Sequence, residues 1–363
     1  MEKIAEVWCC VALAASRIKG VTAAVLEAFY KAVPPAESPF VCTELCSHQL
    51  LRRALADRCY VAGLEEELFQ LASQGIGLLS IVDPRYPYLL RQIFDPPQLL
   101  FYSGNLACFG ADVKGVAVVG SRKGDACGCK IAFDLSRELA AGGATVVSGL
   151  AAGIDSAAHQ GALASHGDTP TIAVLGSGLR CIYPRSNESL ARDIVDHGGL
   201  IVSQFSPNEP PYPSNFLNRN RVIAGLALGV LVVQAAARSG SLVSARYALE
   251  EGREVMAVPG SILDPRYEGS NRLIKEGAHL VSSITDILEG IPGLAACQKE
   301  RAEEEVVSDN KIIQYLRANG PMRVDVLQTH MARDDSFSQE LLELELAGLV
   351  VRAPGNILLL GPQ

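Results

Sequence analysis

Glycine, serine and arginine residues follow several of the apolar runs in this chain. Glycine lets an extended ligand approach the backbone, while serine hydroxyls and free amides donate hydrogen bonds. Glycine also ends strands for purely conformational reasons, so one such cluster is weak support for a site. Four clusters together predict an anion site, with Arg122 as a fixed cation. The clusters are Gly120-Ser121-Arg122; Ser148-Gly149-Leu150-Ala151 with Gly153-Ile154-Asp155; Gly176-Ser177-Gly178; and Ser239-Gly240-Ser241.

The segment 215–221, NFLNRNR, offers a second kind of chemistry. The Phe216 ring could stack on a nucleobase while Arg219 and Arg221, on either side of Asn220, hold phosphates. Proteins that bind single strands without sequence preference combine these two contacts. The structural alternative places Phe216 in the core and pairs the arginines with nearby acids. The residues alone leave both interpretations open.

Motifs for catalysis or metal binding are not found in the sequence. The turn after 116–119 lacks the Gly-x-Gly-x-x-Gly spacing of a dinucleotide site, and no P-loop or Ser/His/Asp arrangement occurs. Asp155 and His159 lie four residues apart, as on one helix face, but a packing role is favoured for the histidine. The ten cysteines show no Cys-x-x-Cys spacing, which predicts reduced thiols. We therefore expect no catalytic residue, no metal and no cofactor.

The glycine-rich clusters need a sheet whose strand ends meet along one edge. Nearly continuous apolar strands separated by helical segments are typical of a parallel sheet covered on both faces. This alternation predicts a doubly wound α/β sheet, in which the carboxyl ends of the strands share an edge. The expected strands are 116–119, 145–148, 171–175, 199–202, 229–233 and 254–258.

Composition along the chain predicts three domains and a linker. Residues 1–80 are mostly helical in pattern, and Ile18–Val21 resembles the hairpin of a helix-hairpin-helix element, with Gly20 in the turn. A helical hairpin inside a packing domain is the favoured alternative. The α/β sheet occupies 81–294, where 83–104 is expected to be an extended connector. The polar segment 295–309 is the expected linker. Residues 310–363 fit three short helices and a β-ribbon, as in a winged-helix domain.

The charge balance restricts the kind of partner. The net charge is −8, with 20% charged and 48% hydrophobic residues, as in a soluble globular protein. A broad basic face is excluded, so any nucleic acid must bind in a local basic pocket. The sequence has no uninterrupted run of about 18 apolar residues, so no membrane span is predicted. The first residues are interpreted as a helix of the mature protein, which favours the cytoplasm.

These motifs together resemble the DprA/Smf family of DNA-processing proteins, from Tyr86 to Ile287. The resemblance implies an extended Rossmann-like core with a helical N-terminal domain and a C-terminal winged-helix-like domain. It also implies a homodimer that binds and protects incoming single-stranded DNA and loads a RecA-type recombinase during natural transformation. Single-strand-binding protein is a further partner to consider. The matching motifs are VAVVGSR, VVSGLAAGID with AAHQGAL, TIAVLGSGL with IYP, NRNRVIAGL, SGSLVSARYALEEGREVMAVPG and GSNRLIKEGA.

The resemblance assigns roles to individual residues. Arg122 should hold a phosphate, Phe216 should meet a base, and the Ser239–Ser241 turn should contribute amide or hydroxyl contacts. Arg219 and Arg221 should build the pocket wall, and Lys275 is a candidate supporting cation. The full set expected to bind single-stranded DNA is Gly120, Ser121, Arg122, Gly149, Gly153, Phe216, Arg219, Asn220, Arg221, Ser239, Gly240, Ser241 and Lys275.

Several positions depart from the family pattern. Leu217 replaces a frequent proline, and the segment 211–213, Pro-Tyr-Pro, replaces basic residues. Gln204 and Gln234 stand where the family usually has glutamate. An amide keeps the hydrogen-bonding capacity of a carboxylate but removes its charge. These changes bear on affinity more than on function.

Two regions suggest alternatives. The expected recognition helix, around 335–347, carries Asp335, Glu340, Glu343 and Glu345 and no basic residue, so DNA phosphates should repel it and it should contact protein. The alternative for the whole chain is a nucleotide hydrolase resembling the LOG phosphoribohydrolases. Their catalytic glutamate lies near where this chain has Ser244 and Ala245. A purely structural dimerisation protein is a third interpretation.

Overall fold

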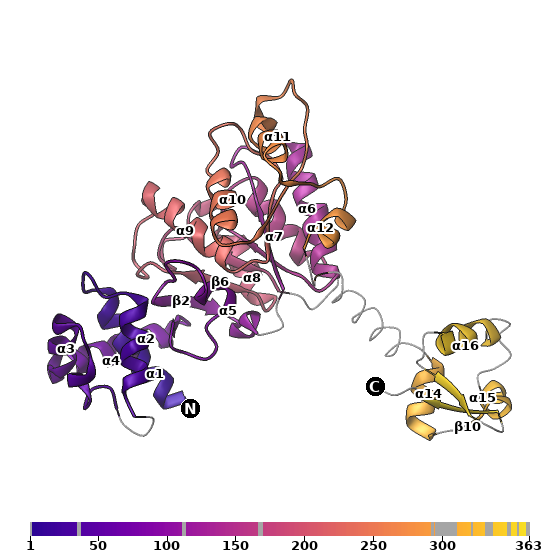
Figure 1. The fold of residues 1–363 in the computed structure, drawn as a ribbon, viewed down its shortest axis with the longest axis horizontal. Helices are drawn as coiled ribbons and strands as arrows, with labels where there is room; N and C mark the ends of the chain where they lie inside the picture. The colour runs from indigo at the N-terminus through magenta and orange to yellow at the C-terminus, as the bar shows by residue number, and fades with distance from the viewer. Residues whose placement is uncertain are drawn as a thin grey trace. The chain divides into compact units, whose positions relative to one another are not determined.

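The chain divides into two compact units, residues 1–294 and 295–363, in this computed structural model (Figure 1). Among the described residues, the first unit contains a sheet with the strand order β1-β2-β6-β5-β4-β3-β7-β8-β9. The second contains a sheet with the order β10-β12-β11. The structure describes residues 2–34, 38–110, 114–165, 170–291, 294, 311–320, 322–330, 337–346, 350–353 and 356–360.

The sheet of the first unit is parallel from β6 to β9. Its central strands are buried along their whole length, which explains their uninterrupted apolar sequence. The six strands predicted from the sequence are confirmed as β3 to β8, within two residues at each end. The strands are β3 (Gly115–Val119), β4 (Thr145–Ser148), β5 (Ile172–Val174), β6 (Leu200–Ser203), β7 (Gly229–Val232), β8 (Glu254–Ala257) and β9 (His279–Leu280).

Successive residues of each strand pack against different helices, because side chains alternate between the two faces of a sheet. Ala117 and Val119 of β3 belong to the core cluster that includes α9 and α10. Val116 and Val118 belong to the cluster that includes α6, α7 and α12. Helices therefore cover both faces, which confirms the predicted doubly wound, Rossmann-like α/β core. The helices are α6 (Ala126–Ala141), α7 (Ile154–Leu163), α8 (Glu188–Asp196), α9 (Pro213–Gly225), α10 (Ser241–Glu250), α11 (Glu268–Lys275) and α12 (Ile284–Gly290).

Two antiparallel strands extend the parallel sheet at one edge. β1 (Gly77–Ser80) pairs with β2 (Leu99–Gly104), and β2 pairs with β6. The segment 83–104 was predicted to be an extended connector, and its last six residues instead form a strand of the main sheet. β1 lies at the end of the segment predicted to be mostly helical. Strands this short give little periodic signal, and their pairing depends on partners distant in the sequence.

Four helices precede the sheet (Figure 1): α1 (Glu2–Ser16), α2 (Ala23–Ala32), α3 (Gln49–Ala56) and α4 (Arg58–Ser73). Trp8 of α1 packs its indole edge-on against Phe29 and Tyr30 of α2, with ring centroids 5.4 and 5.1 Å apart. Gly20 lies in the turn between these two helices at φ 89°, a conformation that glycine adopts without strain. The tight turn predicted at Gly20 is therefore present.

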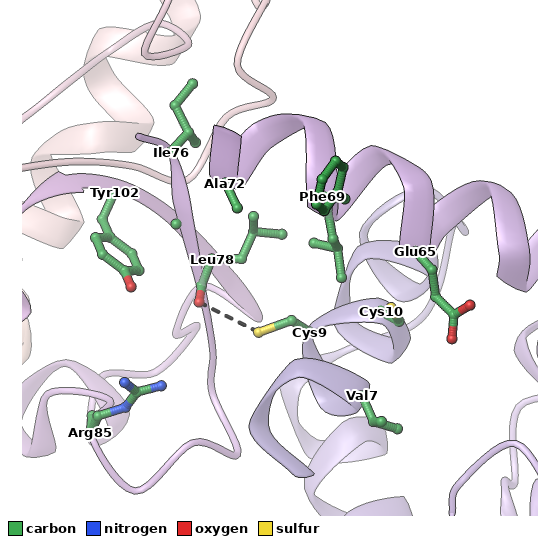
Figure 2. A pocket seen from close by; sticks show the side chains of 12 residues that line it. Val7, Cys9, Cys10, Glu65, Phe69, Ala72, Ile76, Leu78, Arg85 and Tyr102 are labelled. Atoms are coloured by element: carbon green, nitrogen blue, oxygen red, sulfur yellow. Dashed lines mark hydrogen bonds between the residues drawn. The ribbon is translucent and has the colours of Figure 1, made fainter. Parts of the chain in front are cut away.

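A cavity of about 540 Å³ lies among α1, α4 and the β1–β2 hairpin (Figure 2). Its walls are mostly apolar, with Leu68 and Phe69 from α4 and Leu78 from β1. Arg85 also lines the cavity, but its guanidinium is bonded to the Asp83 carboxylate at 2.8 and 3.0 Å. The polar group best able to hold a charged ligand here is thus already paired.

The second unit packs three described helices against its small sheet. Buried residues from α14, α16 and β12, including Ile312, Leu341 and Leu358, form its core. The winged-helix assignment remains a prediction. The elements are α14 (Lys311–Asn319), β10 (Met322–Arg323), α15 (Val324–His330), α16 (Phe337–Leu346), β11 (Val350–Ala353) and β12 (Ile357–Leu360). Across the described helices of both units, none is both long and apolar enough to span a bilayer.

Candidate functional site

The loops after β3 and β7 diverge at the centre of the main sheet. β3 and β7 are neighbours in the sheet. The chain leaves β3 toward α6, which packs on one face, and leaves β7 toward α10, which packs on the other. A crevice at such a switch point is the usual ligand site of an open α/β sheet. A cavity of about 300 Å³ opens here, lined by the loops after β3, β4 and β7 and by α9.

The β3 loop forms one wall of this cavity. Ser121 donates its backbone N–H to the carbonyl of Gln234 at 2.8 Å, which ties this loop to the end of β7. Gly120 is required for space, since a Cβ there would come within 2.7 Å of the Ile154 side chain. Arg122 is exposed, and its guanidinium carbon lies 4.6 Å from the centre of the Phe216 ring. This cation therefore rests on an aromatic face and has no carboxylate partner in the described ion pairs.

Arg219 of α9 forms the buried side of the cavity. Its side chain is 3% exposed, and Nη1 donates to the carbonyls of Gly149 at 2.6 Å and of Val174. Nε donates to Asn220 Oδ1 at 3.2 Å. Burial lowers the pKa of Arg219 to about 10, although the nearby Asp155 acts in the opposite direction. The guanidinium remains charged at neutral pH, and it joins the ends of β4 and β5.

Asp155 lines the same cavity at the start of α7 and is 6% exposed. Burial raises the pKa of this carboxyl, while Arg219 and the backbone amides of Ala151 and Gly120 oppose the shift. Asp155 is thus the acidic neighbour of the buried guanidinium in this cavity.

His159 lies one turn further along α7 and is fully buried. Thr171 Oγ1 donates to the carbonyl of Val146, so Nδ1 of His159 must donate to Thr171 Oγ1, 2.9 Å away. Burial lowers the pKa of His159 to about 3, and the charge of Arg219 adds to the effect. The favoured packing role for this histidine is confirmed, since the ring is neutral and lies outside the cavity lining.

The β7 loop forms the opposite wall. Ser239, Gly240 and Ser241 line the cavity, and α10 begins at Ser241 without a side-chain cap. Asn220 Nδ2 donates to the Gly240 carbonyl at 3.1 Å, which positions the turn against α9. The first amides of α10 are already bonded, because those of Ser241, Leu242 and Val243 donate to Ser239 Oγ and to the Ser239 and Gly240 carbonyls at 3.4, 3.2 and 3.1 Å. Arg238, exposed and also in the lining, supplies a cation on this wall.

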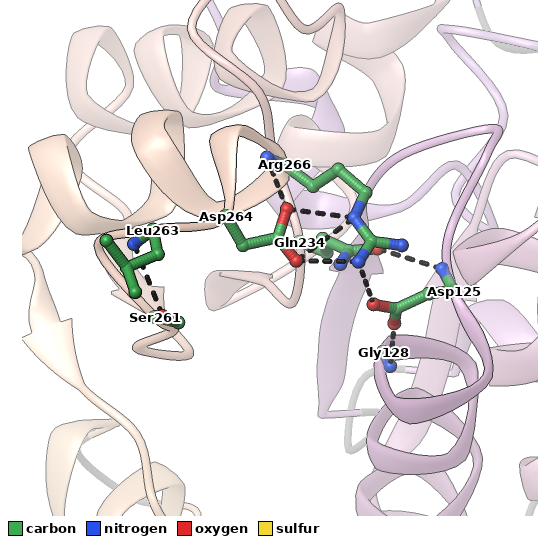
Figure 3. A network of polar contacts seen from close by, with 7 residues as sticks. All are labelled: Asp125, Gly128, Gln234, Ser261, Leu263, Asp264 and Arg266. Atoms are coloured by element: carbon green, nitrogen blue, oxygen red, sulfur yellow. Dashed lines mark hydrogen bonds and ion pairs between the residues drawn. The ribbon is translucent and has the colours of Figure 1, made fainter.

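A polar network links the β3 loop, the end of β7 and the loop after β8 (Figure 3). Arg266, in the loop after β8, pairs with Asp264 at 2.6 Å and with Asp125 at 2.9 Å. The Asp125 backbone N–H donates to Gln234 Oε1 at 3.1 Å. These ion pairs and this hydrogen bond therefore fix the positions of the three segments relative to one another.

The structure brings most of the predicted site residues together and leaves four outside the cavity lining. Those in the lining are Gly120, Ser121, Arg122, Phe216, Arg219, Asn220, Ser239, Gly240 and Ser241. Gly149 lies under the Arg219 guanidinium, and Gly153 adopts φ 81° beside the Ser121 carbonyl. Both glycines lie outside the lining and leave room for the cavity residues that pack against them. Lys275 is exposed at the end of α11 and Arg221 lies on another side of α9.

Arg221 and Arg219 do not build one wall. Arg221 Nη2 donates to Gln204 Oε1 at 2.7 Å, and Nη1 lies 3.3 Å from Asp95. Side chains two positions apart on an α-helix project in directions about 200° apart. The two arginines of this motif therefore point away from each other. Gln204 and Gln234 both accept hydrogen bonds in place of the family's carboxylates, as predicted for these departures.

Sequence reasoning missed two residues of this region. Arg238 precedes the Ser239–Ser241 turn directly, and its position next to a predicted anion loop was the available signal. Tyr183 belongs to the IYP motif, and its ring centroid lies 5.6 Å from that of Phe216. Only the tertiary contact identifies this tyrosine.

Comparison with known proteins gives consistent matches. The profile of the family described as "DNA recombination-mediator protein A" matches residues 77–292. The DNA processing protein DprA of Streptococcus pneumoniae is 47% identical over 213 residues, which cover 58% of this chain and 72% of that protein. Protein Smf of Escherichia coli is 40% identical over 302 residues, which cover 81% of this chain and 80% of that protein.

Two solved structures are similar over most of their length. The X-ray structure of DprA from Streptococcus pneumoniae aligns with a TM-score of 0.62 and 35% identity, covering 78% of this chain and 98% of that one. A structure of DNA processing protein A from Helicobacter pylori, described for its single-stranded DNA binding mode, aligns with a TM-score of 0.53 and 28% identity. It covers 62% of this chain and 96% of that one.

Proposed function

This chain belongs to the DNA recombination-mediator protein A family, and on that premise we propose that its switch-point cavity binds single-stranded DNA. The protein would then deliver this DNA to a RecA-type recombinase. The relative from Helicobacter pylori is described as binding single-stranded DNA, which supports the choice of ligand.

One observation carries the proposal: the cavity has anion-binding groups on two walls and an aromatic ring between them. Arg122 lies on one wall, and Arg238 with the hydroxyls of Ser239 and Ser241 lies on the other. Phe216 lines the space between. Cations and hydroxyls hold phosphates whatever the base, and aromatic rings stack on any base. Such a site suits a single strand of arbitrary sequence.

The acidic balance of the chain fits a contact confined to this cavity. The net charge is −8, so a long-range attraction between DNA and the whole surface is not available. Binding should therefore involve few phosphates and show a modest salt dependence, since the slope follows the number of phosphates neutralised.

A gel-shift series with single-stranded and duplex DNA, each with and without recombinase, tests the proposal. We expect the single strand to bind more tightly than the duplex, and the recombinase to assemble faster on strands carrying this protein. Equal affinity for both forms of DNA would overturn the choice of ligand. Unchanged recombinase assembly would overturn the mediator role alone.

The remaining parts of the proposal concern assembly and setting. We propose a cytoplasmic homodimer that protects incoming single strands during natural transformation and that catalyses no reaction. Single-strand-binding protein, which would cover the same DNA, is a further candidate partner. Light scattering measures the dimer, and nuclease digestion of bound strands measures protection.

The second unit is proposed to contact protein. On α16, Glu345 pairs with Arg352 at 2.7 Å, and Glu343 is exposed. The exposed Glu343 carboxylate would repel phosphates, whereas that of Glu345 is already paired. A chain lacking residues 305–363 should keep its affinity for duplex DNA, and a specific loss of duplex binding would contradict this assignment.

The nucleotide hydrolase is the competing proposal, because a cavity of about 300 Å³ also suits a mononucleotide. Ser244, near the position of the hydrolases' catalytic glutamate, is buried and lines the cavity. A serine hydroxyl cannot replace a carboxylate as the base or nucleophile of that reaction without further activation. Release of free base from nucleoside monophosphates would favour the hydrolase. No binding of single strands at low salt would instead favour a purely structural dimerisation protein.

A further inference from the structure

Protein groups pack against the Phe216 ring on several sides. The Arg122 guanidinium carbon lies 4.6 Å from its centre and that of Arg219 lies 5.9 Å away. Gly176 lies so close that a Cβ there would come within 2.6 Å of the ring. The side chain is only partly exposed as a result. The part of Phe216 that is open to a nucleobase is therefore the part that lines the cavity.

Tyr183 continues the aromatic surface outward from Phe216. The two ring centroids are 5.6 Å apart and the ring planes are inclined by 59°. Tyr183 is 46% exposed and is not part of the cavity lining. Its ring therefore lies beside the cavity and presents surface to the solvent that Phe216 does not.

The segment that carries Tyr183 is held at both ends. Ser177 Oγ donates to the Cys181 carbonyl at 2.6 Å, before the tyrosine. After it, Asn187 Nδ2 donates to the Leu150 carbonyl at 2.9 Å and to Ser156 Oγ at 2.8 Å. Leu150 and Ser156 flank the glycine-rich turn after β4, so the tyrosine is fixed relative to the cavity floor. A platform held in place in advance loses little conformational entropy on binding.

We propose that Tyr183 is a base-stacking residue for the nucleotide adjacent to the one that enters the cavity. The inference rests on the proposed binding of single-stranded DNA. It adds that the strand leaves the cavity on the side of Tyr183. The ligand group is any nucleobase, because stacking on an aromatic ring does not depend on sequence. The tyrosine hydroxyl is not required for this contact.

The Tyr183→Ala variant tests the proposal by equilibrium binding of a fluorescent oligothymidine. We expect about tenfold weaker binding, since one stacked base contributes on the order of 1–3 kcal/mol and tenfold corresponds to about 1.4 kcal/mol. Tyr183→Phe should bind as the wild type does. Tyr88→Ala is the matched control, because Tyr88 is an exposed tyrosine of the same unit outside the cavity lining. Wild-type affinity in Tyr183→Ala would overturn the proposal.

A second variant keeps the test independent of local unfolding. In Tyr183→Trp the indole should be quenched by the oligothymidine and not by the same backbone made of abasic sites. The natural Trp8 is 5% exposed, so its fluorescence should stay constant. This background is measured on the wild-type protein. Absence of quenching on saturated protein would overturn the proposal.

The two proposals fail in different ways. If Arg122→Ala weakens binding while the Tyr183 variants bind normally, single-strand binding stands and Tyr183 is not a platform. If the wild type binds no single strand, the proposed function and the role of Tyr183 are both overturned.

Discussion

Two cavities lined by described residues of the first unit differ in size and in chemistry. The one among α1, α4 and β1 measures about 540 Å³ and has mostly apolar walls (Figure 2). The one at the switch point measures about 300 Å³ and is lined by cations, serines and amides. In the larger cavity Arg85 is neutralised by Asp83, whereas Arg122 in the smaller one contacts only a ring among the described ion pairs and ring contacts. The unpaired Arg122, and not the volume, makes the smaller cavity the candidate for a charged ligand.

The two cavities also differ in whether buried charged residues form their walls. In the switch-point cavity Arg219 and Asp155 are 3% and 6% exposed. Charges that lose their water must be compensated by partners and hydrogen bonds. The smaller cavity therefore depends on a polar arrangement for its shape, while the larger depends on apolar packing.

The largest effect is expected from Arg219→Ala. It removes hydrogen bonds to the Gly149 and Val174 carbonyls and leaves Asp155 without its neighbouring cation. A buried acceptor that loses its hydrogen-bond donor costs about 1–3 kcal/mol. Chemical denaturation should show a loss of this order together with loss of DNA binding. An unchanged unfolding midpoint would show that the cavity does not depend on this charge.

Arg122→Ala should weaken binding of single-stranded DNA about tenfold and reduce the salt slope by about 1, as expected for one lost phosphate contact. Because the side chain is exposed, folding stability should fall only by the roughly 0.5–1 kcal/mol of its contact with the Phe216 ring. Lys123→Ala is the matched control, since Lys123 is an exposed neighbour outside the cavity lining. Equal losses in both variants would indicate a general charge effect in place of a specific site.

The pH dependence of stability should report the buried His159. Its pKa is lowered to about 3 in the folded state, below the ordinary value of 6.5, so between these values the unfolded chain binds the extra proton. Stability is therefore lost as pH falls below about 6.5, by at most about 1.4 kcal/mol per pH unit. Denaturant titrations of His159→Gln should show a shallower dependence on pH from 6.5 to 4.5. Parallel curves would contradict the neutral, buried assignment.

The smallest effect is expected in the larger cavity. Ala72→Phe places a ring in its apolar space, and binding of single-stranded DNA should stay within about twofold of wild type. Fluorescence anisotropy measures this directly. A tenfold loss would show that the two cavities are coupled and that the comparison between them is incomplete.

The sequence alone predicts much of the fold and part of the site. Uninterrupted apolar strands such as 116–119 and 229–232 can exist only where both faces of a sheet are covered, so the doubly wound core follows from hydrophobic patterning. The clusters at Gly120 and Ser239 then converge because parallel strands end at a common edge. The acidic composition likewise limits nucleic-acid binding to a local pocket. These inferences need only local pattern and general topology.

Side-chain direction was decided by the tertiary structure. Arg219 and Arg221 look equivalent in the motif, yet one is buried under the cavity and the other pairs with Gln204 and Asp95. The pairing of β1 and β2 and the contact between Tyr183 and Phe216 join residues distant in the chain. Such contacts depend on which faces of separate elements meet, and that is fixed by packing of the whole core. The sequence determined which chemical groups are present at the sheet edge, and the tertiary structure decided which of them face the cavity.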